Sequence, residues 1–548
     1  MLPPPPPPYF PDSQPVNHIL IEGDNLEALT ALAYTHEGKV DVIYVDPPYN
    51  TGNKDFIYND RFVDKEDGYR HSKWLSFMHK RLRIAKRLLS DRGVIFISID
   101  DNEQAQLKLL CDEVFGGNNF IGQLILKTAT DNNPSQINTE HEYMLCYAQC
   151  KENQGNWKRQ SQAAKRIVET YNKLKQKCLC VEAIQKELRK WIRENKTLLP
   201  QVGHYNKVDE KGVYSSSGNS SNPHPGGYTY DILHPITYKP CPKPQNGWRW
   251  PQETFEAYDK AGEIEWGMDE STQPHVKKRI ETSMEYLRTL IYEDNRGTTK
   301  ALSEIFNGKK VFDNPKPTTV LSRIIDFASD DNSTILDFFA GSGTTLHATM
   351  LLNAEDGGKR KCILVTNNEN GICENVTYER NRRVIQGYTN AKGEQVPGLA
   401  GNNLRYYRTG FVSREQINAN LRKLVYASTD LLCIKNDVYT ETPMQGRKLN
   451  KRYCRYFDNG KERMLVIYDE RVIPELVEII KEMPERPKVK VYVFSYNEYA
   501  YDDNFIDVAD KVELCALPDA ILKACQKVLP ERKTEYLPEV AIEKGGEA

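Results

Sequence analysis

The sequence predicts an α/β protein whose core is a doubly wound, mostly parallel sheet. Apolar runs of strand length alternate with helical patterns over the first 150 residues and recur after residue 334, and this alternation is typical of βαβ units. Two of the runs end in motifs that suit ligand binding, Asp46–Tyr49 and a glycine-rich turn at 341–343. Doubly wound sheets hold ligands beyond the carboxyl ends of their strands, at a switch in strand order. We therefore expect both motifs to line one crevice.

The elements of this sheet can be predicted in order along the chain. Residues Trp74–Ala85 and Asp101–Val114 have the apolar spacing of amphipathic helices. Before, between and after these helices, apolar runs bounded by polar residues predict strands. The predicted strands are Ile19–Ile21, Val42–Val45, Val94–Ile99, Phe120–Leu126, Tyr143–Tyr147, Ile335–Phe339 and Cys362–Thr366.

Composition limits the class of protein. The chain has 548 residues, of which 39% are hydrophobic, and this length predicts two to four domains. Residues 1–17 contain a run of six prolines and predict a proline-rich tail, not a signal peptide. No apolar run approaches the ~20 residues that a membrane helix needs. The 12 cysteines lack CxxC spacing, which predicts neither a metal site nor a disulfide framework and favours a reducing cytoplasm.

The middle of the chain differs in charge. The net charge of −2 argues against a nucleic-acid partner, but residues 151–200 contain 13 Lys and Arg against 5 Glu. This local excess suits contact with phosphates, although a solvated helix face would give the same pattern. Apolar residues at near-heptad spacing predict a helix over 161–195, interrupted at Gln185, that packs on a partner or on the body of the protein.

Residues 203–250 form a segment rich in Gly, Ser, Pro, Asn, Tyr and His that ends in Trp248-Arg249-Trp250. Aromatic and basic residues in loops suit contacts with bases and with the nucleic-acid backbone. An ordinary loop-rich packing module is the alternative. The position of the segment between the two motifs favours target recognition.

Residues 401–548 predict a further α/β domain. Met464–Tyr468 and Val489–Phe494 have strand patterns, and Pro474–Met483 and Pro518–Val528 have helical patterns. The domain contains no catalytic constellation, so we expect it to serve as a dimer contact, a DNA clamp or a docking surface.

The motif Asp46-Pro47-Pro48-Tyr49 suits a planar group that carries an exocyclic amine. Prolines lack an N–H group, so their carbonyls can accept hydrogen bonds from a ligand. Asp46 and the Pro47 carbonyl can each accept one N–H of the amine while Tyr49 stacks on the ring. In a nucleic acid, such a ring must first be flipped out of the helix. For this motif alone, a simple strand-ending turn is the more frequent explanation.

The second motif is the turn after the strand that begins near Ile335. Gly341 and Gly343 allow a tight turn and a close approach of the backbone to a ligand. The dinucleotide pattern G-x-G-x-x-G is absent because Leu346 occupies its third position. A nicotinamide cofactor is therefore disfavoured.

Together, Asp46–Tyr49 and the D-x-F-x-G-x-G element formed by Asp337, Phe339, Gly341 and Gly343 resemble the motifs of DNA amino-methyltransferases. The chain is most similar to the modification (Mod) subunits of type III restriction–modification systems, over most of residues 18–390. Further stretches that carry this resemblance are Gly23–Leu29, Asn50–Phe56, Gly93–Glu103, His141–Tyr143, Gly226–Asp231 and Asn314–Pro317.

The resemblance implies a Rossmann-like S-adenosylmethionine-dependent methyltransferase fold. The catalytic motif precedes the cofactor motif, as in the permuted β-group of these enzymes, with the target recognition domain between them. The expected domains are a tail (1–17), the catalytic half of the core (18–150), the target recognition domain (151–310), the cofactor half (311–400) and an interaction domain (401–548).

The resemblance also implies roles for single residues. Asp46, Pro47, Pro48 and Tyr49 would be catalytic. Asp24 would lie near the adenosine portion of S-adenosylmethionine, and Lys316 would steady the pocket or pair with the cofactor carboxylate. The ribose would be held by Asn367 or by Glu369. The remaining expected cofactor-binding residues are Asp337, Phe339, Gly341, Gly343 and Thr344.

The function implied is methylation of adenine N6 in double-stranded DNA by base flipping, in the cytoplasm of a prokaryote. The alternatives are cytosine-N4 methylation, a DNA specificity subunit without catalysis and, with less support, an RNA or protein amine methyltransferase. The resemblance implies two partners, a second copy of the chain and a separate restriction subunit. The restriction subunit would supply the helicase and nuclease, because the sequence contains no motif of either kind.

Overall fold

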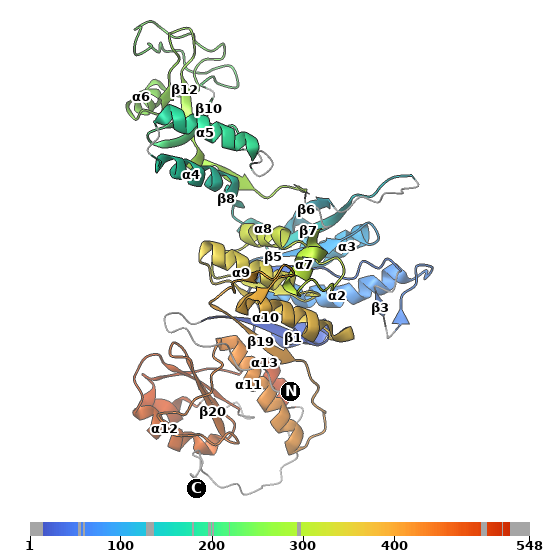
Figure 1. Cartoon of the computed structure of the whole chain (residues 1–548). Coiled ribbons are helices and arrows are strands. Elements are labelled where there is room, and N and C mark those ends of the chain that lie inside the picture. The colour runs from blue at the N-terminus through green and yellow to red at the C-terminus, as the bar shows by residue number, and fades with distance from the viewer. Residues whose placement is uncertain are drawn as a thin grey trace. The chain divides into compact units, whose positions relative to one another are not determined.

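A computed structural model describes residues 15–52, 56–58, 61–127, 136–177, 180–195, 199, 202–218, 220–292, 297–494, 501–517 and 519–526 (Figure 1). Most of the predicted proline-rich tail, residues 1–14, lies outside these described residues. The chain divides into two compact units, one formed by residues 1–155 and 288–548 and the other by residues 156–287.

The first unit is built on a nine-stranded sheet that confirms the predicted α/β class. All neighbouring strands are parallel except β7, which is antiparallel to both of its neighbours. In spatial order the strands are β14 (Leu290–Ile291), β6 (Phe120–Lys127), β7 (His141–Ala148), β5 (Leu89–Ile99), β2 (Val40–Val45), β15 (Thr334–Asp337), β16 (Lys361–Thr366), β1 (Val16–Glu22) and β19 (Asn402–Arg408).

The strand order explains where a ligand can bind. The chain enters the sheet at β1, but β15 and β16 lie between β1 and β2. The first half of the core therefore continues from β2 towards β5, while the second half continues from β15 towards β16. The boundary between β2 and β15 is the topological switch point, where the carboxyl ends of parallel strands leave a crevice.

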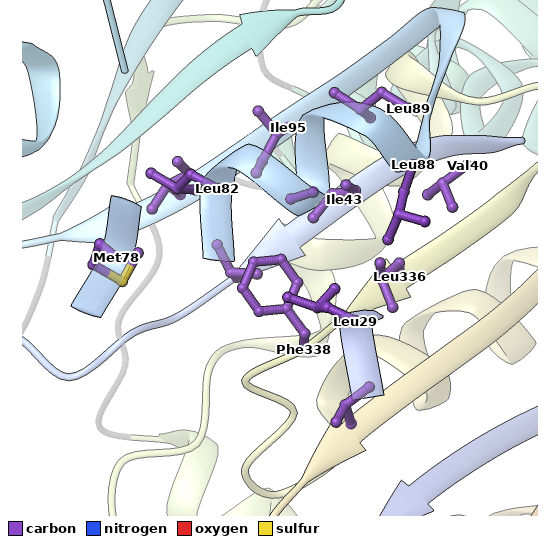
Figure 2. Packing of buried hydrophobic residues seen from close by; sticks show 14 of the residues in the cluster. Leu29, Val40, Ile43, Met78, Leu82, Leu88, Leu89, Ile95, Leu336 and Phe338 are labelled. Atoms are coloured by element: carbon purple, nitrogen blue, oxygen red, sulfur yellow. The ribbon is translucent and has the colours of Figure 1, made fainter. Parts of the chain in front are cut away.

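Helices accompany the sheet in both halves of the core. Side chains of α1 and α2 form one hydrophobic cluster with Ile43, Ile95 and Leu336 of three neighbouring strands (Figure 2). The alternate residues Val42 and Tyr44 are also buried, as expected for a parallel sheet covered on both faces. The helices are α1 (Asn25–Leu32), α2 (Arg70–Leu88), α3 (Gln104–Cys111), α7 (Thr298–Ile305), α8 (Thr318–Ala328), α9 (Thr344–Asp356) and α10 (Glu379–Gln386).

The predicted helices of this unit form with shifted ends. The segment expected as one helix over Asp101–Val114 is helical from Gln104 to Cys111 and continues as a π-helical turn over Asp112–Gly116. The unit also contains two short hairpins, β3 (Ile57–Tyr58) with β4 (Arg61–Phe62) and β17 (Tyr388–Thr389) with β18 (Gln395–Val396).

The second unit contains two helices where the sequence predicted one. The segment 161–195 forms α4 (Gln162–Lys175) and α5 (Val181–Glu194), and Cys178 of the predicted repeat lies outside the described residues. Gln185 lies inside α5 and accepts a hydrogen bond from the Val208 backbone. The apolar repeat, including Ile167 and Leu188, is buried in a core shared by both helices, so the prediction of a single helix with a near-heptad face was wrong.

The remaining elements of this unit form small sheets and one helix. They are β8 (Lys158–Gln160) with β13 (Met284–Tyr286), the four-stranded sheet of β9 (Lys207–Asp209), β10 (Gly212–Gly218), β11 (Ile264–Glu265) and β12 (His275–Arg279), and α6 (Gln252–Lys260).

The C-terminal region has its own four-stranded sheet, as the strand and helix patterns predicted. Its start needs correction, because the boundary expected at 401 would cut off β19, which pairs with β1 over its whole length. Residues 518, 527 and 528 of the predicted last helix lie outside the described residues. The elements are α11 (Asn418–Asn436), β20 (Cys454–Asp458), β21 (Arg463–Ile467), α12 (Ile473–Lys481), β22 (Val489–Val493), β23 (Val512–Leu514) and α13 (Asp519–Gln526).

Within the described ranges, no helix combines the length and apolar character needed to cross a membrane.

Candidate active site

The loop Asp46–Tyr49 begins where β2 ends, at the switch point. The Tyr49 hydroxyl donates a hydrogen bond to Asp46 Oδ1 at 2.9 Å, which fixes the carboxylate and the aromatic ring relative to each other. Pro47 is buried. The Pro48 carbonyl accepts a hydrogen bond from Trp74 Nε1 at 2.7 Å. The expectation that both proline carbonyls are free for a ligand was therefore wrong for Pro48, which instead anchors the loop to α2.

Two residues from distant parts of the chain complete this cluster. Lys316, just before α8, donates hydrogen bonds from Nζ to the Tyr49 hydroxyl at 2.7 Å and to both carboxylate oxygens of Glu142 at 2.8 Å. The same ammonium lies 3.4 Å from Asp46 Oδ1. Lys316 therefore lies with the catalytic motif, although the sequence placed it with the cofactor-binding residues.

The electrostatics of the cluster follow from burial and from the two carboxylates. Burial raises the pKa of Asp46, Lys316 opposes this shift, and the negative charge of Glu142 adds to it. Burial lowers the pKa of Lys316, but Asp46 and Glu142 outweigh burial and hold it above its usual value. Lys316 is thus charged at neutral pH. Burial, followed by the two carboxylates, raises the pKa of Tyr49 well above its usual value, so this residue stays a neutral phenol.

A cavity of ≈ 420 Å³ opens beside Tyr49 and Glu142. Its volume lies in the range of small-molecule pockets. The wall is formed by the loop after β5 and by the start of β7, so it contains carboxylates, an amide and an imidazole. The lining residues are Tyr49, Asp100, Asp101, Asn102, Thr139, His141 and Glu142.

The glycine-rich turn lies at the end of β15, the strand next to β2. Gly341 has φ = 49° and Gly343 has φ = 74°, conformations that side-chain-bearing residues rarely adopt. A Cβ atom at Gly343 would lie 2.5 Å from Asn381 Nδ2, whereas at Gly341 the nearest atom would be Phe312 Cζ at 3.5 Å. Gly343 is therefore required by packing inside the protein, whereas a Cβ at Gly341 would make only an ordinary van der Waals contact.

Asp337 and Thr344 shape this turn from within. The Asp337 carboxylate accepts hydrogen bonds from the Phe339 amide at 3.0 Å and from the Thr345 hydroxyl at 2.5 Å. Burial raises the pKa of Asp337 to about 7, and the negative charge of Asp46 contributes to that shift. The Thr344 hydroxyl is buried and accepts a hydrogen bond from Arg380. Phe339 packs against Phe77 of α2, with ring centroids 6.0 Å apart.

Asp24 and Asn367 follow the two strands on the other side of β15. Asp24 begins α1, accepts a hydrogen bond from the Leu26 amide and pairs with Arg81 at 3.2 Å, yet its side chain remains 51% exposed. Asn367 and Glu369 are exposed. The carboxyl ends of β2, β15, β16 and β1 thus bring Asp46, the glycine turn, Asn367 and Asp24 to one edge of the sheet.

Sequence reasoning missed the site roles of Glu142 and Trp74. Glu142 is a charged residue in an otherwise apolar run that continues to Ala148, and it is 7% exposed. A carboxylate in such a run is a signal that could have identified it, because buried carboxylates require a partner. The partner, Lys316, follows it by 174 positions, and no local pattern connects the two.

Together the sheet and the two motifs define an α/β protein with a candidate ligand site at its topological switch point. The chain belongs to the DNA methylase family, whose sequence model matches residues 40–386.

Three relatives illustrate this membership. The Mod subunit of the type III restriction-modification enzyme EcoP15I from Escherichia coli is 38% identical over 373 residues, which cover 64% of this chain and 58% of the relative. The StyLTI Mod subunit from Salmonella typhimurium is 34% identical, with 64% and 52% covered. The type II methyltransferase M.KpnI from Klebsiella pneumoniae is 32% identical, with 67% and 84% covered. The matched part of the chain thus spans little more than half the length of the two Mod subunits.

Proposed function

We propose that the chain is a site-specific DNA methyltransferase that transfers a methyl group from S-adenosylmethionine to adenine N6. The observation that carries this proposal is the placement of Tyr49, which donates a hydrogen bond to Asp46, beside a cavity and one strand away from a glycine turn. In that turn a Cβ at Gly341 would meet no atom closer than 3.5 Å. One reactant can occupy the cavity and the other the turn, so the geometry supports transfer between two bound ligands.

The residues at the sheet edge fit S-adenosylmethionine. Gly341 and Phe339 would line its methionine end, Asp24 would face the adenosine portion, and Asn367 or Glu369 would reach the ribose hydroxyls. When bound, the cofactor supplies a methyl group on a sulfonium, which is an activated leaving group. Asp337, Gly343 and Thr344 would act indirectly by holding the turn.

The cluster around Asp46 fits an exocyclic amine. Asp46 and the Pro47 carbonyl would accept the two N–H groups and orient the nitrogen lone pair away from the ring plane, while the face of Tyr49 would stack on the base. The carboxylate also stabilises the positive charge that develops on nitrogen during methyl transfer. Holding both reactants in line can lower the barrier by ~7–11 kcal/mol. A base in duplex DNA reaches this site only by flipping.

Cytosine N4 is the second candidate target, because it is also an exocyclic amine beside a ring nitrogen. Single-molecule sequencing of DNA from cells that express the chain tests both possibilities. N6-methyladenine within one short sequence motif is the expected result, N4-methylcytosine would replace the proposed target, and unmodified DNA would favour a specificity subunit without catalysis.

We further propose that the chain works as a homodimer on double-stranded DNA in the prokaryotic cytoplasm, with a separate restriction subunit. The names of two relatives, both Mod subunits of type III restriction-modification enzymes, support the separate restriction subunit. Light scattering should give about 126 kDa, twice the 63.0 kDa of the chain. A mass of 63.0 kDa with and without DNA would reject the dimer.

A further inference from the structure

Among the described residues of the first unit, Arg81, Arg360 and Arg380 are buried, and they differ in how their charge is balanced. Arg81 pairs with Asp24 at 3.2 Å. Arg360 pairs with Asp356 at 2.8 Å and with Asp331 at 3.5 Å. Arg380, in α10, is 3% exposed. Among the residues that the structure describes, no carboxylate forms an ion pair with Arg380, and its buried Nε has no hydrogen-bond partner. Within the described ranges, Arg380 is therefore a buried cation without a counter-ion.

The guanidinium of Arg380 lies directly against the glycine turn. Nη1 donates hydrogen bonds to the Thr344 hydroxyl at 2.7 Å and to the Ser342 hydroxyl at 3.0 Å. Nη2 donates to Thr318 at the start of α8 at 3.4 Å and to His347 Nδ1 at 3.3 Å. These acceptors are all neutral. Three of them are hydroxyls, and burial, followed by the charge of Arg380, lowers the pKa of His347 to about 3.

Uncompensated burial of a cation is costly, and proteins normally pair such a charge. Burial accordingly lowers the pKa of Arg380 to about 9. The position adds further positive potential, because Thr344 begins the 13-residue helix α9 and Thr318 begins α8, and the N-terminal ends of helices attract anions. The turn is thus prepared for a negative group that the described residues do not supply.

The hydroxyls show how the charge can act on a ligand. Ser342 and Thr344 accept hydrogen bonds from Arg380 with their oxygens, and their own hydroxyls lie 3.0 Å apart. One hydroxyl proton serves that contact, and the other remains for a further acceptor. Arg380 therefore orients hydroxyl donors at the start of α9 in addition to supplying charge.

We propose that Arg380 is a positioning residue for the carboxylate of the amino-acid portion of S-adenosylmethionine, acting through Ser342, Thr344 and the field at the start of α9. This inference rests on the proposed cofactor and extends it. It predicts that removing the guanidinium lowers the binding affinity only for ligands that carry the carboxylate.

The test compares two ligands by calorimetric titration of the full-length chain. S-adenosylhomocysteine carries the amino-acid group, whereas 5′-methylthioadenosine shares the adenosine and sulfur but lacks that group. In R380M and R380Q, affinity for S-adenosylhomocysteine should fall roughly ten- to a hundredfold, as expected when a charge-assisted interaction is removed. Affinity for 5′-methylthioadenosine should change less than about twofold. R380K, which keeps a cation, should restore most of the difference.

R360M is the matched control, because it removes an arginine that is equally buried but paired. It should lower the melting temperature without changing the ratio of the two affinities. The inference is overturned if R380M and R380Q weaken both ligands equally or neither, or if only R380Q folds and leaves the ratio unchanged. If neither variant folds, R380K decides, and a lost preference for S-adenosylhomocysteine despite the retained cation would reject the charge argument. Wild-type protein that binds neither ligand would instead reject the proposed cofactor.

Discussion

The ammonium of Lys316 donates hydrogen bonds to both carboxylate oxygens of Glu142 at 2.8 Å, joining residues 174 positions apart. The pair lies next to Asp46 and holds the catalytic motif, a reversed strand of the sheet and the start of the cofactor half together. Without Lys316, the rise in the pKa of Asp46 that burial and the negative charge of Glu142 cause would be larger.

Lys316→Met should therefore destabilise the protein by about 3 kcal/mol and slow methylation by roughly 100-fold, because an unpaired buried charge is costly and Asp46 loses acceptor strength. Affinity for S-adenosylhomocysteine should stay within about threefold. Urea unfolding and calorimetry measure both effects. The double variant with Glu142→Gln should recover more than half of the stability, and additive losses would contradict the pairing.

Asp46→Ala should reduce methylation by roughly 100- to 1,000-fold or more while cofactor affinity is retained, because the proposed function places Asp46 against the amine and not against the cofactor. Incorporation of a labelled methyl group into DNA measures the rate. Asp313→Ala removes an exposed carboxylate close to Lys316 in sequence and should leave the rate unchanged. Near wild-type activity of the Asp46 variant would reject the catalytic assignment.

The two glycines of the turn should respond differently to the same substitution. Gly343→Ala places Cβ against Asn381 and should cost about 2 kcal/mol of stability or more. The Cβ of Gly341→Ala meets no atom closer than 3.5 Å, so this variant should lose about 1 kcal/mol of stability, from backbone strain alone. Its affinity for the cofactor should nevertheless fall at least roughly tenfold. Thermal unfolding and calorimetry separate these effects. Undiminished cofactor affinity in folded Gly341→Ala would show that the ligand does not approach this glycine.

Acid should destabilise the fold through His18. Its Nδ1 accepts a hydrogen bond from the Cys362 amide, and burial lowers its pKa from 6.5 to about 4. The folded state thus favours neutral His18, so its contribution is complete above pH 6.5 and is lost as the pH falls towards 4, by about 3 kcal/mol. In urea unfolding from about pH 7.5 to about pH 4.5, His18→Asn should flatten the dependence of stability on pH. His224→Asn, an exposed control, should leave the slope unchanged, and equal slopes in all three proteins would contradict the assignment.

DNA affinity should depend on the exposed lysines of α4 and the residues that follow it. Replacing Lys173, Lys175 and Lys177 with alanine should weaken binding at all sequences and flatten the slope of log affinity against log salt by about 0.9 for each phosphate that the protein no longer neutralises. Fluorescence anisotropy at several salt concentrations measures this slope, and an unchanged slope would leave the segment as a solvated helix face. The charge-matched control replaces Lys359, Lys392 and Lys461.

The sequence by itself determined the fold class, the two ligand motifs and most strands of the central sheet. Period-2 and period-3.6 apolar patterns are local, and so are the turn properties of Pro47, Pro48 and the glycines, so they can be read directly from the chain. The near-heptad spacing over 161–195 led to the wrong prediction of a single helix because this pattern, too, is local. Two helices that pack on each other repeat apolar residues much as one long helix does, and no local pattern marks the break between Lys175 and Val181.

Only the tertiary structure decided which distant residues meet. The insertion of β15 and β16 between β1 and β2 brings Asp46 next to the glycine turn, and β7 brings Glu142 to Lys316. The tertiary structure also places the Pro48 carbonyl against Trp74. It leaves Arg380 buried without a counter-ion among the described residues. These relationships depend on burial and on distances between segments far apart in the chain. They cannot be predicted from the patterns of a single sequence, because an unpaired charge becomes costly only when folding has removed the water around it.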